Sequence, residues 1–223
     1  MTVPEPEGFL AQLTPDELAD LHRLGRRRRW ERGETLIREG DAADSVLILT
    51  EGRVKVCSLT ESGVEVILAI RGPGSLLGEF SAIDGEPRSA DVAALEPASG
   101  LVVPVAAFAG YLQNRGRVTL LLLRLVVARM RDADRKRIEF GATDATGRVA
   151  TRLVELAERF GERVPAGLRI SLPISQDELA GWVGASREAV SKALRSLRDR
   201  GLIETGRRRV IIRDLDRLRS RAR

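Results

Sequence analysis

The chain has 223 residues, which suits two modest domains, with 43% hydrophobic residues, 31% charged residues and a net charge of +5. Its longest apolar run, 120–123, is too short to cross a bilayer, and its first residues lack a secretory signal, so we expect a cytoplasmic protein with no membrane partner. One cysteine and one histidine exclude an intrachain disulfide and make a poor haem, iron–sulfur or zinc site.

The surplus of positive over negative charge is confined to the C-terminal part of the chain. Residues 1–140 contain 19 Lys/Arg and 21 Asp/Glu, whereas residues 141–223 contain 18 and 11. This asymmetry indicates nucleic acid as the partner of the C-terminal part, because an arginine-rich composition alone would not divide the charge between the two parts.

The first predicted element is a short helix that begins after Thr14 and ends near Gly25. Thr14 and Glu17 form a capping box, and Pro15 suits the first helical position. Four arginines follow at 26–29, and we interpret them as an exposed strand start rather than as a nucleic-acid patch.

Between residues 30 and 104 the sequence changes to short runs rich in Val, Ile and Leu, separated by glycines. Examples are 45–50, 54–59 and 64–70. Many short strands at regular spacing predict a β-sandwich or jelly-roll barrel, which can hold one small ligand between its sheets. Cys57 lies in one of these runs, and we interpret it as ordinary strand packing.

Residues 77–94, LGEFSAIDGEPRSADVAA, combine groups suited to a sugar and a phosphate. Gly78 lets the backbone approach a ligand, and the carboxylate of Glu79 can accept hydrogen bonds from sugar hydroxyls. Arg88 and Ser89 offer a forked cation and a hydroxyl to a phosphate. We interpret the residues between the two ends as a short loop.

Residues 106–140 are predicted to be helical, and 118–140 contain neither Gly nor Pro. Leu123, Val127 and Met130 are spaced as in an apolar seam for a partner helix, which Asp134 and Arg137 continue as a polar part. We interpret this seam as a dimer interface rather than as packing on the chain's own barrel, because the helix is too long for one small barrel to cover.

Gly141 is predicted to interrupt this helix, and residues 144–148 to restart a helix that runs over 147–160. We therefore expect three segments: a barrel domain at 1–117, a dimerisation helix at 118–141 and a DNA-binding domain at 142–223. A short strand is expected at 168–172.

The remaining residues predict a winged helix-turn-helix. Ser175 and Glu178 form a second capping box, and a turn at 184–186 leads to a helix over 187–200 that Ser186 caps. The runs 202–204 and 209–212 flank a basic tip and are typical of a β-wing.

The start of the second helix of this motif is polar, as in helices whose first residues reach base edges in the major groove. Arg187 can pair with guanine and Glu188 with cytosine, whereas the wing arginines suit phosphates. An ordinary charged helix face is the alternative. The candidate DNA-binding residues are Ser175, Gln176, Ser186, Arg187, Glu188, Ser191, Lys192, Arg195, Arg207 and Arg208.

The order of cassette, long helix, Asp-x-Thr-Gly-Arg hinge and winged helix with Ser-Arg-Glu-x-Val resembles the cyclic-AMP receptor protein and fumarate–nitrate regulator superfamily over nearly all of 14–215. The resemblance implies an α+β fold: an N-terminal β jelly-roll cyclic-nucleotide-binding domain, a long dimerisation helix and a C-terminal winged helix-turn-helix domain. It also implies a homodimer that binds double-stranded DNA at a TGTGA-like palindrome and acts on RNA polymerase, without cofactor, metal or catalytic residues.

The same resemblance implies a cyclic nucleotide as the ligand, cyclic AMP or cyclic GMP, with its ribose near Gly78 and Glu79 and its phosphate at Arg88 and Ser89. The long helix would contribute further residues. The candidate ligand-binding residues are therefore Gly78, Glu79, Phe80, Arg88, Ser89, Ala90, Arg129, Ala133 and Asp134.

One departure leaves the ligand open. Ala133 and Asp134 stand where the cyclic-AMP receptor protein reads adenine with a Thr-Ser pair. The alternatives are cyclic AMP held differently, another small molecule, and a ligand-independent regulator with a vestigial pocket. An enzyme is the third hypothesis, and the chain offers it no nucleophile–base set or zinc-ligand spacing.

Overall fold

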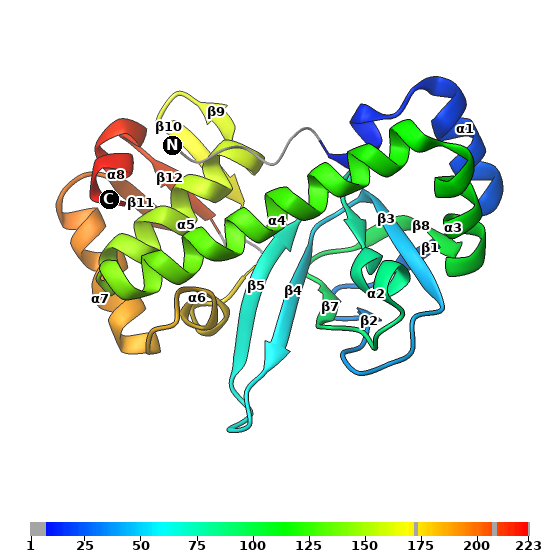
Figure 1. The fold of residues 1–223 in the computed structure, drawn as a ribbon. Helices are drawn as coiled ribbons and strands as arrows, with labels where there is room; N and C mark the ends of the chain where they lie inside the picture. The colour runs from blue at the N-terminus through cyan, green and yellow to red at the C-terminus, as the bar shows by residue number, and fades with distance from the viewer. Residues whose placement is uncertain (1–7, 172–173, 207–208, 223) are drawn as a thin grey trace. The chain divides into compact units, whose positions relative to one another are not determined.

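The structure is a computed structural model that describes residues 8–171, 174–206 and 209–222. These residues form two compact units, and Figure 1 shows their elements in chain order. We call residues 8–58 and 68–131 the barrel unit, and residues 59–67 with those from 132 onward the C-terminal unit. Within the described ranges, no helix is both long and apolar enough to span a membrane.

The barrel unit consists of two four-stranded sheets with strand orders β1-β8-β3-β6 and β2-β7-β4-β5, the latter including the β4–β5 hairpin whose tip belongs to the C-terminal unit. This arrangement confirms the predicted jelly-roll class of fold. Its strands are β1 (Arg26–Trp30), β2 (Thr35–Ile37), β3 (Ser45–Glu51), β4 (Val54–Leu59), β5 (Glu65–Arg71), β6 (Leu76–Leu77), β7 (Asp91–Ala94) and β8 (Ala98–Pro104), and its short helices are η1 (Phe9–Gln12), α1 (Pro15–Leu24), α2 (Glu79–Asp84) and α3 (Val105–Asn114).

Strand β3 shows why this region reads as a continuous apolar run. Val46 and Ile48 join a core that includes residues of η1, α1 and α3, whereas Leu47 and Leu49 join a second core with residues from both sheets. Successive strand residues point to opposite faces, so a strand buried on both faces shows no polar alternation. Among the described strands, β1 lies at the edge of its sheet beside β8, and its four arginines are exposed, which confirms their interpretation as a solvated edge.

The predicted helix over 106–140 consists of two helices, α3 and α4 (Gly116–Ala142), separated at Arg115. The expected interruption at Gly141 was wrong, because α4 continues through this residue and ends at Ala142. A glycine in a helix costs only about 1 kcal/mol, which the rest of a 27-residue helix can tolerate. The divisions at 117 and 141 stay predictions.

The C-terminal unit is built around three packed helices and one antiparallel sheet with strand order β11-β12-β10-β9. The sequence predicted its helix-turn-helix and wing, but it did not predict β9, and β10 begins one residue earlier than expected. The elements are α5 (Ala145–Phe160), β9 (Glu162–Val164), β10 (Gly167–Ser171), α6 (Gln176–Val183), α7 (Arg187–Asp199), β11 (Ile203–Gly206), β12 (Arg209–Ile212) and α8 (Leu215–Arg221).

Helix boundaries in both units follow the caps predicted from the sequence. Thr14 accepts a hydrogen bond from the Glu17 backbone, and Ser175 accepts one from the Glu178 backbone, each within a complete capping box. Ser186 caps α7 in the same way through the backbone N–H of Ala189. These bonds satisfy N–H groups that a helix start otherwise leaves without partners, so they fix where each helix begins.

Candidate functional site

The cassette of the barrel unit lies where β6 ends and α2 begins. Gly78 has a φ of 76°, and a side chain here would place its Cβ 2.5 Å from the Arg88 guanidinium, so both the backbone angle and the space require glycine. The segment that we expected to be a loop contains α2 instead. The expectation of a loop was wrong because Gly78 and Gly85, both left-handed, bound a six-residue helix of residues that were too few to show a helical period.

Arg88 is buried, with 5% of its surface exposed. Its guanidinium donates to the Gly78 carbonyl at 2.9 Å and to the Ser45 carbonyl at 2.5 Å, and one nitrogen lies 3.3 Å from an oxygen of Asp44. The Ser45 hydroxyl and the Arg88 guanidinium hold the pKa of Asp44 below its usual value. The sequence did not single out Asp44 or Ser45, because they are far from the cassette in the chain and form no recognisable motif with it.

Glu79 is also buried and has a charged partner within the same unit. It forms an ion pair with Arg129 of α4, whose guanidinium also donates to the Leu76 carbonyl at 2.7 Å. Gly78, Glu79, Arg88 and Arg129, four of the predicted ligand-binding residues, are therefore connected through direct contacts. A buried ion pair with additional hydrogen bonds keeps both side chains in one position.

The other predicted cassette residues surround this group less closely. Phe80 and Ser89 are exposed, and Ala90 is buried beside β7. Ala133 and Asp134 are exposed on α4 and belong to the C-terminal unit. Among the residues that the structure describes, no three His, Cys, Asp or Glu side chains are placed to hold a metal ion.

The second candidate site is the exposed face of α7 in the C-terminal unit. Val190, Leu194 and Leu197 are buried in the unit's core, which turns the opposite side of the helix toward solvent. The polar residues of α7 are spaced by three or four positions and therefore form one stripe. Arg187, Glu188, Lys192 and Arg195 are exposed in this stripe and Ser191 is half-buried.

The electrostatics of this stripe are those of accessible charges. A hydrogen bond from its own backbone N–H, followed by one with Ser186, holds the pKa of Glu188 below its usual value, so this carboxyl is a hydrogen-bond acceptor at neutral pH. Ser175 and Gln176 are exposed at the start of α6. The wing arginines Arg207 and Arg208, predicted as phosphate contacts, lie outside the described residues.

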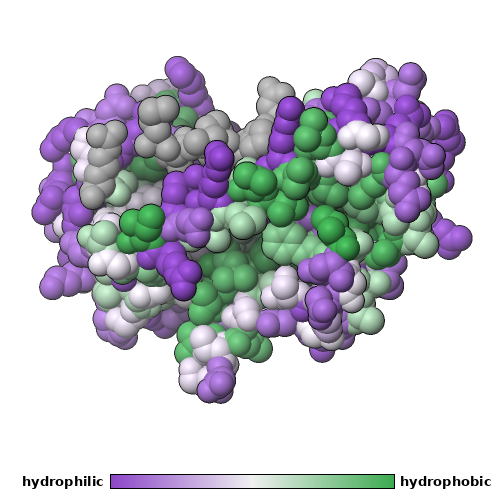
Figure 2. All heavy atoms as spheres, viewed as in Figure 1, coloured by the Kyte–Doolittle hydropathy of each residue, from purple (hydrophilic) through white to green (hydrophobic). Residues whose placement is uncertain are grey.

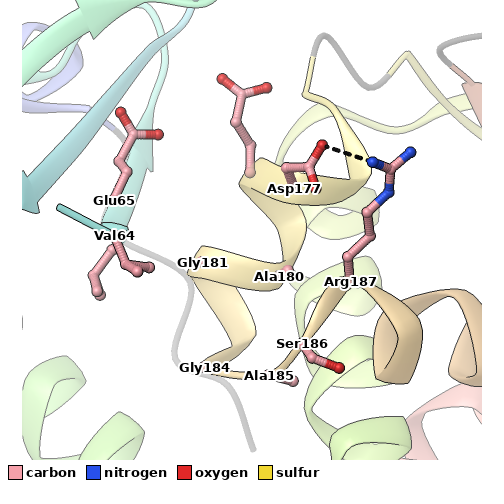
Figure 3. A pocket seen from close by; sticks show the side chains of 11 residues that line it. Val64, Glu65, Asp177, Ala180, Gly181, Gly184, Ala185, Ser186 and Arg187 are labelled. Carbon is pink, nitrogen blue, oxygen red and sulfur yellow. Dashed lines mark ion pairs between the residues drawn. The ribbon is translucent and has the colours of Figure 1, made fainter. Parts of the chain in front are cut away.

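An open pocket of about 640 Å³ borders the turn between α6 and α7 within the C-terminal unit (Figure 3). Residues of this turn and the tip of the β4–β5 hairpin line it, and Arg187 lies 3.6 Å from Asp177 at its edge. A Cβ at Gly181 would come within 2.3 Å of the Glu65 carbonyl, so close approach of two backbones requires glycine here.

Below this surface, a buried ionic cluster joins the end of α4 to α5 and α6. Arg152 is 4% exposed, pairs with Glu139 and, at 2.6 Å, with Glu155, and its guanidinium carbon lies 5.7 Å from the centre of the Trp182 ring. Burial raises the pKa of Glu139 despite the opposing charge of Arg152. Sequence reasoning missed this cluster, because Glu139 and Arg152 appear as ordinary charges on two helices.

A second set of contacts fixes the same junction. Arg148 donates to the Val183 carbonyl at 2.7 Å and to the Thr143 carbonyl at 2.5 Å, and lies 5.5 Å from the Phe140 ring centre. A Cβ at Gly184 would come within 2.5 Å of Phe140. These contacts attach the end of α6 and the turn between α6 and α7 to the last turn of α4.

Comparison with known proteins gives two family matches along the chain. Residues 27–115 match the cyclic nucleotide-binding domain, and residues 147–221 match the Crp-like helix-turn-helix domain. The cassette lies in the first match and the α7 stripe in the second.

Individual relatives cover nearly the whole chain. The "CRP-like cAMP-activated global transcriptional regulator" of Mycobacterium tuberculosis is 33% identical over 216 residues, 97% of this chain and 96% of the relative. FixK2 from Bradyrhizobium japonicum has a similar structure, with a TM-score of 0.78, 24% identity and coverage of 88% of this chain and 96% of that one. The "c-di-GMP responsive global regulator CLP" of Xanthomonas campestris has a TM-score of 0.77, 21% identity and coverage of 90% and 100%.

Proposed function

Because the chain belongs to the cyclic-AMP receptor protein and fumarate–nitrate regulator superfamily of transcription regulators, we propose that it is a homodimer that binds a TGTGA-like palindrome under the control of a cyclic nucleotide. The chain carries a cyclic nucleotide-binding domain and a DNA-binding helix-turn-helix domain. RNA polymerase is the proposed partner on the promoter, and the cytoplasm is the proposed location.

The buried Arg88 is the observation that carries the ligand proposal. Burying a guanidinium costs free energy that carbonyl partners only partly offset, and an anionic phosphate would offset more of it. Arg88 contacts Gly78, the neighbour of Glu79, so a cation and a carboxylate meet at one loop-to-helix junction. This spacing suits a cyclic ribose phosphate, with Arg88 and Ser89 at the phosphate and Glu79 at the sugar.

Cyclic AMP is the proposed ligand, since the relative with 33% identity is named as cAMP-activated. Arg129, Ala133 and Asp134 are the proposed contacts of the base, and the Asp134 carboxylate would accept a hydrogen bond from an amino group. Adenine and guanine both carry such a group, which keeps cyclic GMP as the first alternative. A structural relative described as c-di-GMP responsive makes a third nucleotide worth testing.

The exposed stripe of α7 supports the DNA proposal. Arg187, Glu188 and Lys192 project from the first turns of the second helix of the motif, the part that enters the major groove in such proteins. Arg187 would read guanine and Glu188 would accept from cytosine, whereas Ser175 and Gln176 would contact phosphates.

A ligand-independent regulator is the second candidate, and one observation favours it. Both charged groups of the cassette already have partners in the protein: Arg88 bonds to backbone carbonyls, and Glu79 pairs with Arg129. The cassette therefore has internal bonds that would hold a vestigial pocket in place.

Isothermal titration of the purified protein at fixed salt tests the proposal and separates the two candidates. We expect saturable heat with cyclic AMP, near one nucleotide per chain, and tighter binding of a fluorescent TGTGA palindrome in its presence. Absence of heat with cyclic AMP, cyclic GMP and c-di-GMP, together with tight binding of the palindrome, would favour the ligand-independent regulator. Absence of palindrome binding under all these conditions would overturn the DNA proposal.

A further inference from the structure

Helix α4 has two apolar faces, and the residues that the structure describes cover one of them. The buried face includes Val118, Leu122 and Leu125, which belong to the core of the barrel unit, and Leu121, which is also buried. The other face is open, and apolar side chains along the middle of α4 are visible in Figure 2. Its residues are Leu120, 48% exposed, Leu123, 58%, Val127, 40%, and Met130, 62%.

The open face follows the spacing of a coiled-coil seam. Leu120, Leu123, Val127 and Met130 are separated by three, four and three positions, which are the a and d positions of a heptad. The next a and d positions are occupied by Asp134 and Arg137. The seam is therefore apolar toward the start of α4 and charged toward its end.

The charged side chains of α4 differ in whether they have a partner within the chain. Asp132, on the opposite side of the helix, pairs with Arg135 at 3.1 Å and with Lys136 at 2.8 Å. Within the described ranges, Asp134 and Arg137 have no ion-pair or hydrogen-bond partner for their side chains. Within the described residues, Arg124 and Arg131 of α4 are exposed and unpaired as well, so Asp134 and Arg137 are distinguished by their position on the seam.

We propose that, in the nucleotide-free protein, Asp134 of each copy pairs with Arg137 of a second copy in a parallel α4–α4 dimer. This inference rests on the proposed homodimer and adds what selects its register. In a parallel pair related by a two-fold axis, equal residues lie at equal heights, and Asp134 and Arg137 are about 4.5 Å apart along the axis. Two reciprocal ion pairs then form, and each offsets the repulsion between facing equal charges.

The charged layer also excludes other arrangements of the two helices. An antiparallel pair centred on the seam would place Asp134 against the apolar layers near Leu123, which would bury a carboxylate without a partner. A shift by one heptad would bring Asp134 against Val127 with the same cost. A polar layer in an apolar seam therefore specifies a parallel, in-register pair.

Charge exchange in solution tests the ion pairs directly. Asp134→Arg makes the layer wholly positive and Arg137→Asp makes it wholly negative, so each variant alone is expected to dimerise roughly tenfold more weakly or worse. A mixture of the two is expected to form the mixed dimer in large excess over the statistical half, as measured by native mass spectrometry and sedimentation without nucleotide. The double variant Asp134→Arg/Arg137→Asp is expected to regain dimerisation, because it reverses both pairs.

Two outcomes separate this inference from the homodimer itself. If both single variants dimerise as the parent does and mix statistically, the proposed ion pairs between the copies are wrong, while the proposed dimer along the apolar seam is unaffected. Met130→Glu tests the seam, because it places a carboxylate among the apolar side chains. If Met130→Glu keeps its helix content by circular dichroism and remains a dimer, the proposed homodimer along α4 is overturned. The mixed dimer has no Asp–Arg pair within either helix, so its excess could not come from intrahelical contacts.

Discussion

The charged side chains of the two candidate sites differ in burial and in their partners. In the cassette, Arg88 and Glu79 are buried and already bonded to backbone carbonyls or to Arg129. On α7, Arg187 and Lys192 are exposed, and Arg187 lies 3.6 Å from the carboxylate of Asp177.

This difference teaches what each site demands of its partner. A ligand in the cassette has to offer the buried groups bonds at least as good as those it displaces, because an unpaired buried charge is costly. Such a site selects by geometry. A partner on α7 displaces only water and counterions, so affinity there depends on salt and selection depends on the edges of the bases.

The largest loss of stability is expected from a change in the buried cluster of Arg152, Glu139 and Glu155. Arg152→Met leaves the carboxylates of Glu139 and Glu155 without their main cation, and we expect the free energy of unfolding to fall by about 3–5 kcal/mol. Denaturant unfolding measures this fall in the free energy of unfolding. Adding Glu139→Gln and Glu155→Gln to Arg152→Met should recover part of the loss, and a loss below about 1 kcal/mol would show that the cluster is not paired as described.

In the cassette, Arg88→Gln should weaken nucleotide binding by roughly 100-fold, about 3 kcal/mol, because a neutral amide replaces a charge-assisted bond to phosphate. Calorimetric titration measures this change, and circular dichroism checks that the fold is retained. Arg26→Gln is the matched control, since Arg26 is an exposed arginine on β1 of the same unit. Equal affinity in both variants would place the phosphate elsewhere.

On α7, Arg187→Ala should reduce discrimination at one guanine of the half-site by roughly 1–3 kcal/mol while leaving the free energy of unfolding nearly unchanged. Binding of palindromes substituted at single positions measures the first quantity and denaturant unfolding the second. Arg200→Ala, exposed beyond the end of α7, serves as the control. A uniform loss on every sequence would mean that Arg187 contacts phosphate only.

Helix caps allow a comparison in which both units should respond equally. Thr14→Ala in the barrel unit and Ser175→Ala in the C-terminal unit each remove one side-chain cap and should each lower the free energy of unfolding by about 1 kcal/mol. Denaturant unfolding of the two variants measures both losses. Ser175→Ala alone should also weaken DNA binding, and loss of DNA binding in Thr14→Ala instead would contradict the assignment of the two surfaces.

The smallest expected effect is on how the stability of the barrel unit depends on pH. A hydrogen bond from Arg117 lowers the pKa of Glu17 from 4.5 to about 2. A carboxylate with a lowered pKa stabilises the fold fully above about pH 4.5, and this contribution is lost as the pH falls toward 2. Glu17→Gln should therefore cost below about 1 kcal/mol at pH 6, since Arg117 is half exposed, and this cost should disappear as the pH falls through about 2. Unfolding curves at several pH values decide this, and a constant difference would contradict it.

Local signals carried most of what could be predicted from the sequence. Capping residues marked the starts of α1, α6 and α7, because the bonds that they make span only three residues. Gly78, Glu79 and Arg88 were found because a glycine, a carboxylate and an arginine lie within one short segment. Arg129 was added by the resemblance to a family, which carries long-range information that spacing does not.

Features that depend on contacts between distant residues were missed or mistaken. Asp44 and Ser45 hold Arg88 from a different strand connection, and nothing in their own neighbourhood indicates it. Glu139 and Arg152 form a buried pair although charged helical residues are usually exposed. Gly141 was taken for a helix end because its local propensity is unfavourable, yet the helix includes it and ends one residue later, at Ala142.

The short connection between α4 and α5 has a consequence for how the chain would be cut by a protease. Only Thr143 and Asp144 separate the two helices. Arg148 donates to the Thr143 carbonyl, and Asp144 accepts from the Gly147 backbone and pairs with Arg221 at 2.7 Å. Proteases cleave segments that open into an extended form, and this junction offers none without unwinding a helix end. The rate of cleavage there would therefore report the free energy of local opening, and a nucleotide that tightens the junction would be detected as protection from digestion.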